Sequence, residues 1–368
     1  MAATRATIGC HTLVALGLVL SPGTSGRADD RVGAGITYHT DTDGLTVTHP
    51  AASARIAAGE DVHVSAGYQA DVISAATVDV RTAASSRPFE EVRHGADAGV
   101  DVALARLTTL SAGYALSVSP DYLSNALSVS LRHELDDRRH ALTFALSGAH
   151  DSVGRFGDPA PTGEALTLAA SARWAIVLSR DAVVDLGGAV EHRRGYMESP
   201  YRFVTVAGAG SQVRLPEEVP DERWRFAVGG GLRWAIAEPF YVRASYRLHA
   251  DDWGVLGHTV TVSGHLAPAP GWLVTVSGRS LAQRGATFYS GAYATLPDIP
   301  VLRTRDRTLA PHWSLAAEAD VRIPFARVGG FDLGARVRGA VLWHRYFDTP
   351  LLPERTSFQA SLTLIAER

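Results

Sequence analysis

Segments of about ten residues in which apolar and polar side chains alternate are the feature that most constrains this 368-residue chain. Residues 127–132, 242–248 and 313–323 show the pattern clearly, with an apolar residue at every second position. Because successive side chains of a β-strand point to opposite faces, this period of two predicts strands with one apolar face. After residue 20 no apolar run approaches the roughly 18 residues of a membrane helix, so any later membrane crossing must use strands.

The spacing of these segments predicts a barrel. Sixteen candidate strands start near residues 31, 44, 61, 95, 109, 122, 139, 163, 181, 222, 239, 255, 270, 311, 330 and 356. Connectors on one side have seven residues or fewer, whereas the other side receives the long segments 72–94, 151–162, 192–221 and 281–310. A soluble β-sandwich, the alternative, has no reason to segregate loop lengths in this way. The sequence therefore predicts an all-β fold: a transmembrane antiparallel up-and-down β-barrel of about sixteen strands (14 to 18), with short periplasmic turns and long external loops.

The N-terminus has the layout of a secretory signal peptide. Arg5 precedes an apolar stretch at residues 13–20, and the small-x-small triplet at 26–28 follows it. This order predicts a signal peptide at 1–28 and a single outer-membrane barrel domain at 29–368. The one cysteine, Cys10, would leave with the signal, so the mature chain would contain no disulfide and no thiol nucleophile.

Aromatic residues gather near the ends of the candidate strands, where the interfacial girdles of a membrane barrel are expected. They are Tyr38, Tyr68, Tyr122, Trp224, Trp234, Tyr241, Trp253, Trp272, Trp313, Trp343 and Tyr346.

Five stretches carry a family resemblance: DVISAATVD from Asp71, FEEVRHGADAGVDV from Phe89, ESPYRF from Glu198, PDERWRFAV from Pro220 and YVRASYRLHADDWGVLGHTVTV from Tyr241. Over most of the mature chain they resemble the outer-membrane barrels catalogued as domain of unknown function 3570. The motif residues singled out are Asp71, Ser74, Asp79, Asp251, Asp252 and Trp253. The resemblance implies a bacterial outer-membrane barrel and no particular activity. The chain departs from the family pattern at Ala75, where glycine is usual, and in its last residues, which lack the terminal aromatic common in such barrels.

This location implies outer-membrane lipid and lipopolysaccharide as surroundings, and the barrel assembly machinery as a partner during biogenesis. The net charge of −3 argues against a nucleic-acid partner. No motif for a cofactor or a metal is recognised, and none is expected.

Charged residues on the polar faces of the strands would line the lumen. The expected lumen residues are Asp97, Asp101, Arg132, Arg243, Arg247, Arg279, Glu318, Asp320, Arg322, Arg336 and Arg338. They could line a water-filled pore, which a barrel of sixteen strands is wide enough to leave, or they could pair across strands and brace the wall. An excess of arginine on the strands that start near 239, 270 and 330 favours anionic solutes in the first case.

Three further interpretations concern loops. Asp71, Asp79, Glu90 and Glu91 could supply oxygen ligands for calcium on one long external loop, or bind cations associated with lipopolysaccharide. Loop solvation or local capping is the simpler interpretation of these acids. Ser245, Asp252 and His258 could be named as the triad of a hydrolase, although their order says nothing of geometry. The simpler interpretation is that Asp251 and Asp252 form a turn and that Trp253 anchors it at the outer interface. A porin-like channel is the first functional hypothesis, a structural scaffold or partner-binding barrel of the envelope is the second, and an outer-membrane hydrolase is the third.

Overall fold

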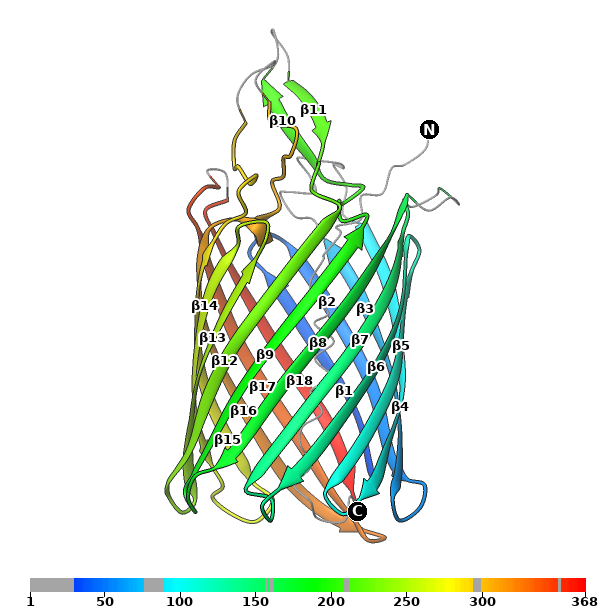
Figure 1. Ribbon diagram of the computed structural model, residues 1–368, viewed down its shortest axis with the longest axis vertical. Coiled ribbons are helices and arrows are strands. Elements are labelled where there is room, and N and C mark those ends of the chain that lie inside the picture. Colours follow the sequence, from blue (N-terminus) through cyan, green and yellow to red (C-terminus); the bar gives the residue numbers. More distant parts are fainter. Residues whose placement is uncertain are drawn as a thin grey trace.

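The chain forms a closed antiparallel barrel of sixteen strands in a computed structural model that describes residues 30–75, 89–155, 158, 162–207, 212–293, 299–349 and 352–368 (Figure 1). The barrel strands are β1 (Arg31–Asp41), β2 (Leu45–Ala57), β3 (Val62–Ala75), β4 (Phe89–Ala105), β5 (Thr108–Ser119), β6 (Tyr122–Leu135), β7 (His140–Val153), β8 (Gly163–Val177), β9 (Ala182–Gly195), β12 (Glu222–Ala237), β13 (Phe240–Asp251), β14 (Leu256–Leu266), β15 (Leu273–Arg284), β16 (His312–Val328), β17 (Phe331–Tyr346) and β18 (Glu354–Glu367). In the described residues, no helix has the length and apolar character needed to span a membrane.

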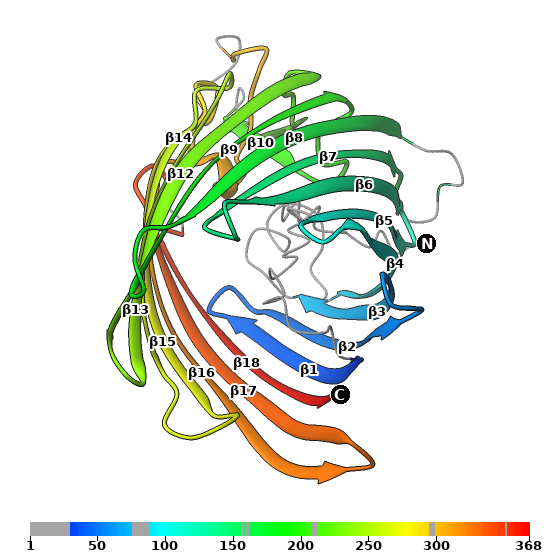
Figure 2. The same ribbon diagram turned by 60° about the horizontal axis from the view of Figure 1, so that its bottom comes forward.

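The strands pair in an up-and-down order. Each barrel strand pairs with the next along the chain, and β18 closes the barrel on β1 in a register that runs from Arg31 opposite Glu367 to Asp41 opposite Ser357. Figure 2 looks obliquely into the barrel from the end that holds the short turns, and it shows the wall continuing around the lumen. The predicted fold class and strand number are thus confirmed. The domain boundary at residue 28 is not tested, because residues 1–29 lie outside the described residues.

Loop lengths are segregated between the two ends of the barrel. At the short-turn end, β2 ends at Ala57 and β3 begins at Val62, while β16 and β17 are joined by residues 329–330 alone. The long-loop end carries residues 76–88, 154–162, 196–221 and 285–311. The predicted loop 72–94 is shorter than expected, because β3 runs on to Ala75 and β4 begins at Phe89.

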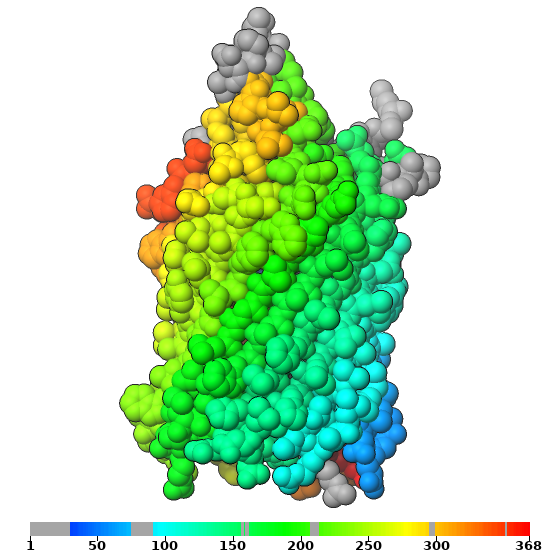
Figure 3. Space-filling view, in the orientation of Figure 1, coloured from blue at the N-terminus to red at the C-terminus, as the bar shows by residue number. Residues whose placement is uncertain are grey.

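The loop 196–221 contains a small hairpin that the alternation pattern did not reveal. Its strands, β10 (Phe203–Ala207) and β11 (Gln212–Pro216), have five residues each and pair only with each other. Figures 1 and 3 show this loop rising above the long-loop end of the wall. Strands this short contain too few residues to establish a period of two.

Apolar side chains lie on the outer face of the wall. Leu127, Leu146 and Val276 are 64%, 65% and 60% exposed, and they alternate with small or polar residues that point inward. In a soluble protein this apolar surface would be unfavourable, whereas in a bilayer it faces hydrocarbon. Every backbone N–H and C=O group of the wall can pair with a neighbouring strand, because a closed sheet has no edge.

The expected aromatic girdles are only partly correct. Tyr38, Tyr68 and Trp234 are about half exposed on the outer face, as a girdle requires. Tyr122, Tyr241 and Tyr346 instead occupy inward positions, since their strand neighbours are the outward residues. Position near a strand end does not determine which face a residue occupies; parity along the strand does.

Candidate functional site

All eleven expected lumen residues occupy the inward face, because each is separated by an odd number of positions from the exposed apolar residues of its own strand. Most of them form ion pairs. Arg336 Nε lies 2.7 Å from Asp320 Oδ2, Arg322 pairs with Glu367 at 2.5 Å, and Arg338 pairs with Glu318. Arg132 pairs with Glu134 at 2.8 Å, Asp101 with Arg55 at 2.9 Å, and Arg243 lies 3.6 Å from Asp185. Asp97, Arg247 and Arg279 have no ion pair among the described residues.

Further charged pairs that the sequence did not identify extend the same arrangement. Asp71, expected on an external loop, lies on the inward face of β3 and binds His49 Nδ1 at 2.6 Å and Arg93 at 2.7 Å. Arg193 pairs with Asp151 at 3.1 Å. Such partly exposed pairs are worth at most about 1 kcal/mol each, so they brace the wall and nearly cancel each other's charge.

Six inward basic residues gather in one part of the lumen. We call Arg247, His249, Arg279, His312, His344 and Arg355 the arginine–histidine cluster; all are inward residues of β13, β15, β16, β17 and β18. Arg355 lies opposite His344 in the β17–β18 register, and the His312 and His344 rings are 5.7 Å apart. None of the three arginines has a carboxylate partner in the part of the chain that the structure describes.

Two buried nitrogen atoms in this cluster lack a hydrogen-bond partner among the described residues: Nδ1 of His344 and Nε of Arg355. Arg233, lower in the wall, also has no acidic partner there, and it faces Arg243 directly across β12 and β13. A guanidinium group offers planar, paired N–H donors that match carboxylate and phosphate oxygens. The arginines of the cluster therefore present fixed positive charge to the lumen, which is the chemistry that attracts anions.

Two long loops dock on each other above this part of the wall. Glu217, in residues 196–221, is 4% exposed, and its carboxylate accepts hydrogen bonds from Arg202 at 3.0 Å, from the Ser199 backbone N–H at 3.1 Å and from Thr304 Oγ1. Thr304 belongs to residues 285–311, and Arg202 also pairs with Asp306 of that loop at 2.9 Å. A buried, multiply bonded carboxylate thus joins the two loops.

An apolar cluster supports this contact from below. Its members are Val219, Trp253, Val255, Ala286, Tyr289, Leu309, Ala310 and Tyr346. Trp253 is 6% exposed, donates from Nε1 to the Glu222 carbonyl at 2.9 Å and stacks against Arg223, whose Cζ lies 4.3 Å from the ring centroid. The expectation that Trp253 anchors a turn at the membrane interface is therefore wrong, because the docked loops cover its ring.

Asp251 and Asp252 do shape the turn that carries Trp253. Asp251 accepts from the Val255 N–H at 2.8 Å and pairs with Arg223, while Asp252 accepts from the Trp224 N–H at 3.0 Å. These carboxylates are thus used in backbone bonding and in one ion pair.

The docked loops are also tied to the rim at two places. Tyr201 donates to Asp121 of the β5–β6 turn at 2.5 Å, and Arg307 binds Asp43 of the β1–β2 turn at 2.5 Å. Tyr289 bonds with Thr349 at 2.9 Å, and burial raises the pKa of its hydroxyl, which therefore stays protonated near neutral pH. Arg307 also lies 5.3 Å from the ring of Tyr346, which stacks on His344. The loops are thus in contact with the arginine–histidine cluster.

The fold separates residues that the other interpretations from sequence had grouped together. Ser245 points inward and the neighbouring-strand residue His258 points outward, where its Nδ1 lies 2.7 Å from Tyr246 Oη, so these two cannot form a catalytic pair. Of the expected calcium ligands, Glu90 and Glu91 belong to β4, while Asp79 lies outside the described residues. Ser74 lies opposite Glu90 near the long-loop end of β3.

Comparisons with known proteins place the chain in a family. The family model described as "Protein of unknown function (DUF3570)" matches residues 78–173 and 167–332. The chain belongs to this family. The matched residues of this DUF3570 barrel include Arg247, Arg279 and Trp253, whereas Asp71, His344 and Arg355 lie outside the match. No curated protein matches the chain.

Solved structures share the barrel architecture. A bacterial polysaccharide outer membrane secretin is 11% identical with a TM-score of 0.53, over 93% of this chain and 99% of that one. OccK11 (OpdR) of Pseudomonas aeruginosa is 9% identical with a TM-score of 0.45, over 92% and 96% of the two chains, and OprD of the same organism is 10% identical with a TM-score of 0.44, over 92% and 95%. At these identities, the likeness to the secretin shows a shared outer-membrane barrel fold alone.

Proposed function

We propose that this DUF3570 barrel is a channel of the bacterial outer membrane that conducts small solutes with a preference for anions. The observation that carries the proposal is the contrast within the lumen wall: most inward arginines are neutralised by a carboxylate, whereas Arg247, Arg279 and Arg355 have none among the described residues. Sixteen strands are enough to leave a water-filled passage. Fixed arginines in such a passage raise the local concentration of anions and lower that of cations.

The proposal is tested by planar-bilayer recording of the purified protein, refolded in detergent. We expect discrete, protein-dependent current steps. In a potassium chloride gradient, we expect a reversal potential whose sign corresponds to a higher permeability for chloride than for potassium. Migration on a gel before and after boiling provides the folding control, because a folded barrel keeps its compact form in cold detergent. A folded barrel that conducts nothing would rule out an open channel. A reversal potential that shows a higher permeability for potassium than for chloride would rule out the anion preference.

The docked loops favour a second candidate, a scaffold that recruits another envelope protein. Val301 is 76% exposed and Phe347 is 64% exposed, both at the long-loop end. Exposed apolar side chains mark a contact surface where they form one contiguous patch. A silent, folded barrel that co-purifies with one envelope protein would support this candidate. The third candidate, a hydrolase, has less support, because Ser245 and His258 of the expected triad lie on opposite faces of the wall.

A further inference from the structure

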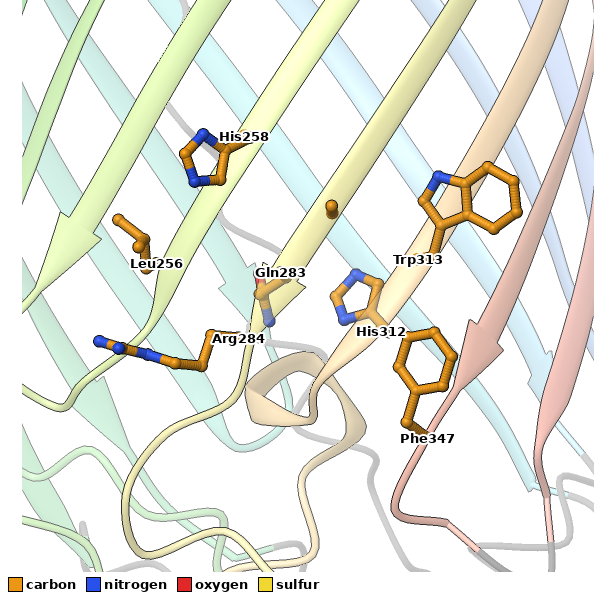
Figure 4. Close-up of a pocket in the computed structure, with 8 residues that line it drawn as sticks. Leu256, His258, Gln283, Arg284, His312, Trp313 and Phe347 are labelled. Atoms are coloured by element: carbon orange, nitrogen blue, oxygen red, sulfur yellow. The ribbon is translucent and has the colours of Figure 1, made fainter.

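The membrane-facing side of the barrel is hollowed at the long-loop ends of β14, β15 and β16. The hollow measures about 450 Å³, and it is lined by Leu256, His258, Ala282, Gln283, Arg284, His312, Trp313 and Phe347 (Figure 4). Leu256, His258, Ala282, Arg284 and Trp313 share the outward face with the apolar residues Val260, Val276 and Leu315. The hollow is therefore continuous with the surface that faces lipid, and at the rim of the barrel it also borders two inward residues, His312 of the arginine–histidine cluster and Gln283.

The strand register explains why a groove exists here. Ala282 pairs with His258 on one side and with Trp313 on the other, so a small side chain lies between two large rings on the same face. Both rings are held in place. Trp313 donates from Nε1 to Ser280 Oγ at 3.0 Å and packs edge-on against Trp343, and His258 bonds to Tyr246 at 2.7 Å. Fixed walls around a small floor keep the groove open instead of letting it collapse.

A cation stands at the membrane-interface end of the groove. Arg284 is exposed, donates from Nε to the Gly254 carbonyl at 3.0 Å, and has no carboxylate partner among the described residues. Its terminal nitrogens remain available as donors. A guanidinium at the long-loop end of an apolar groove complements a molecule with one anionic end and one hydrocarbon end.

We propose that this groove binds one molecule of an anionic, phosphate-headed membrane lipid. The acyl chain lies over Ala282 between His258 and Trp313, and the phosphate accepts hydrogen bonds from Arg284. Charge complementarity and continuity with the lipid-facing wall identify this occupant. The residues assigned to the lipid, which are His258, Ala282, Arg284 and Trp313, lie on the outward face, whereas the proposed conduction depends on inward residues, so the two proposals can fail separately.

The test is native mass spectrometry of the detergent-solubilised full chain titrated with phosphatidylglycerol or, as the zwitterionic comparison of zero net charge, phosphatidylcholine. We expect one phosphatidylglycerol to bind at least tenfold more tightly than phosphatidylcholine. R284Q removes the phosphate contact and A282F fills the groove, and each should weaken phosphatidylglycerol binding about tenfold, since one charge-assisted hydrogen bond contributes roughly 1.5 kcal/mol or more.

Matched controls separate this site from general lipid adhesion. Arg194 is likewise an exposed, outward arginine at the long-loop end, and Ala172 is an outward alanine of the wall, so R194Q and A172F change the same chemistry without touching the groove. Both controls should bind phosphatidylglycerol as the unmodified protein does. Equal binding of the two lipids, full retention of binding in R284Q and A282F, or an equal loss in the controls would each overturn the proposal.

Discussion

Replacing Arg247, Arg279 and Arg355 together by glutamine is expected to abolish the anion preference of the channel. Among the described residues, these three guanidinium groups are the arginines of the cluster without a carboxylate partner. Their removal leaves ion-paired charges and single charges of both signs, such as Arg233 and Asp97. The reversal potential in a potassium chloride gradient should move to within a few millivolts of zero. The change should be largest near 0.1 M salt, where the Debye length is about 10 Å, and small near 1 M, where it is about 3 Å.

A charge-neutral double replacement provides the control for this experiment. R338Q combined with E318Q removes an ion pair from the same wall without changing its net charge. Its reversal potential should match that of the unmodified channel, although the barrel loses up to about 1 kcal/mol of stability. If the triple variant kept the original selectivity, or if the neutral pair changed it as much, the arginine–histidine cluster would not set the preference.

The sequence was sufficient for the wall of the barrel because one local property, the period of two, is repeated in every strand. The segments around Leu127 and around Val242 predicted their strands and their outward faces correctly. The same parity places Arg336 and Arg247 on the inward face, but it cannot tell that the first is neutralised and the second is not. That difference depends on which residue of the neighbouring strand lies within reach, and register is a property of the folded sheet.

Contacts between loops were out of reach for a different reason. Thr304 binds Glu217 across 87 positions of the chain, and Tyr201 binds Asp121 across 80. No local periodicity reveals such pairs. The sequence therefore suggested that the ring of Trp253 is an interfacial anchor, whereas in the structure this ring belongs to a buried cluster. His344 and Arg355 could have been recognised, since parity from Val341 and Phe358 places both inward.

The second large effect is expected at Glu217, whose replacement by glutamine should separate the two docked loops. Its side chain is only 2% exposed and pairs with Arg202, so the change leaves a partly buried guanidinium without one of its two carboxylates. Breaking a buried pair from one side costs about 3 kcal/mol, which corresponds to a roughly hundredfold rise in the population of the open loops. The amides of Glu218 and Arg303 report on it directly, because each donates to the other's carbonyl across the loop contact.

Hydrogen exchange at these two amides, followed in detergent, should therefore be about a hundredfold faster in E217Q, while amides of β5 to β7 keep their protection. E218Q is the matched control. The Glu218 side chain is 47% exposed and 3.6 Å from Arg303, so its loss should change exchange by less than about fivefold. Equal exchange in E217Q and E218Q would mean that the apolar cluster around Trp253 holds the loops together by itself. Fast exchange in E217Q alone would identify the Glu217 carboxylate as the contact that keeps the loops docked above the arginine–histidine cluster.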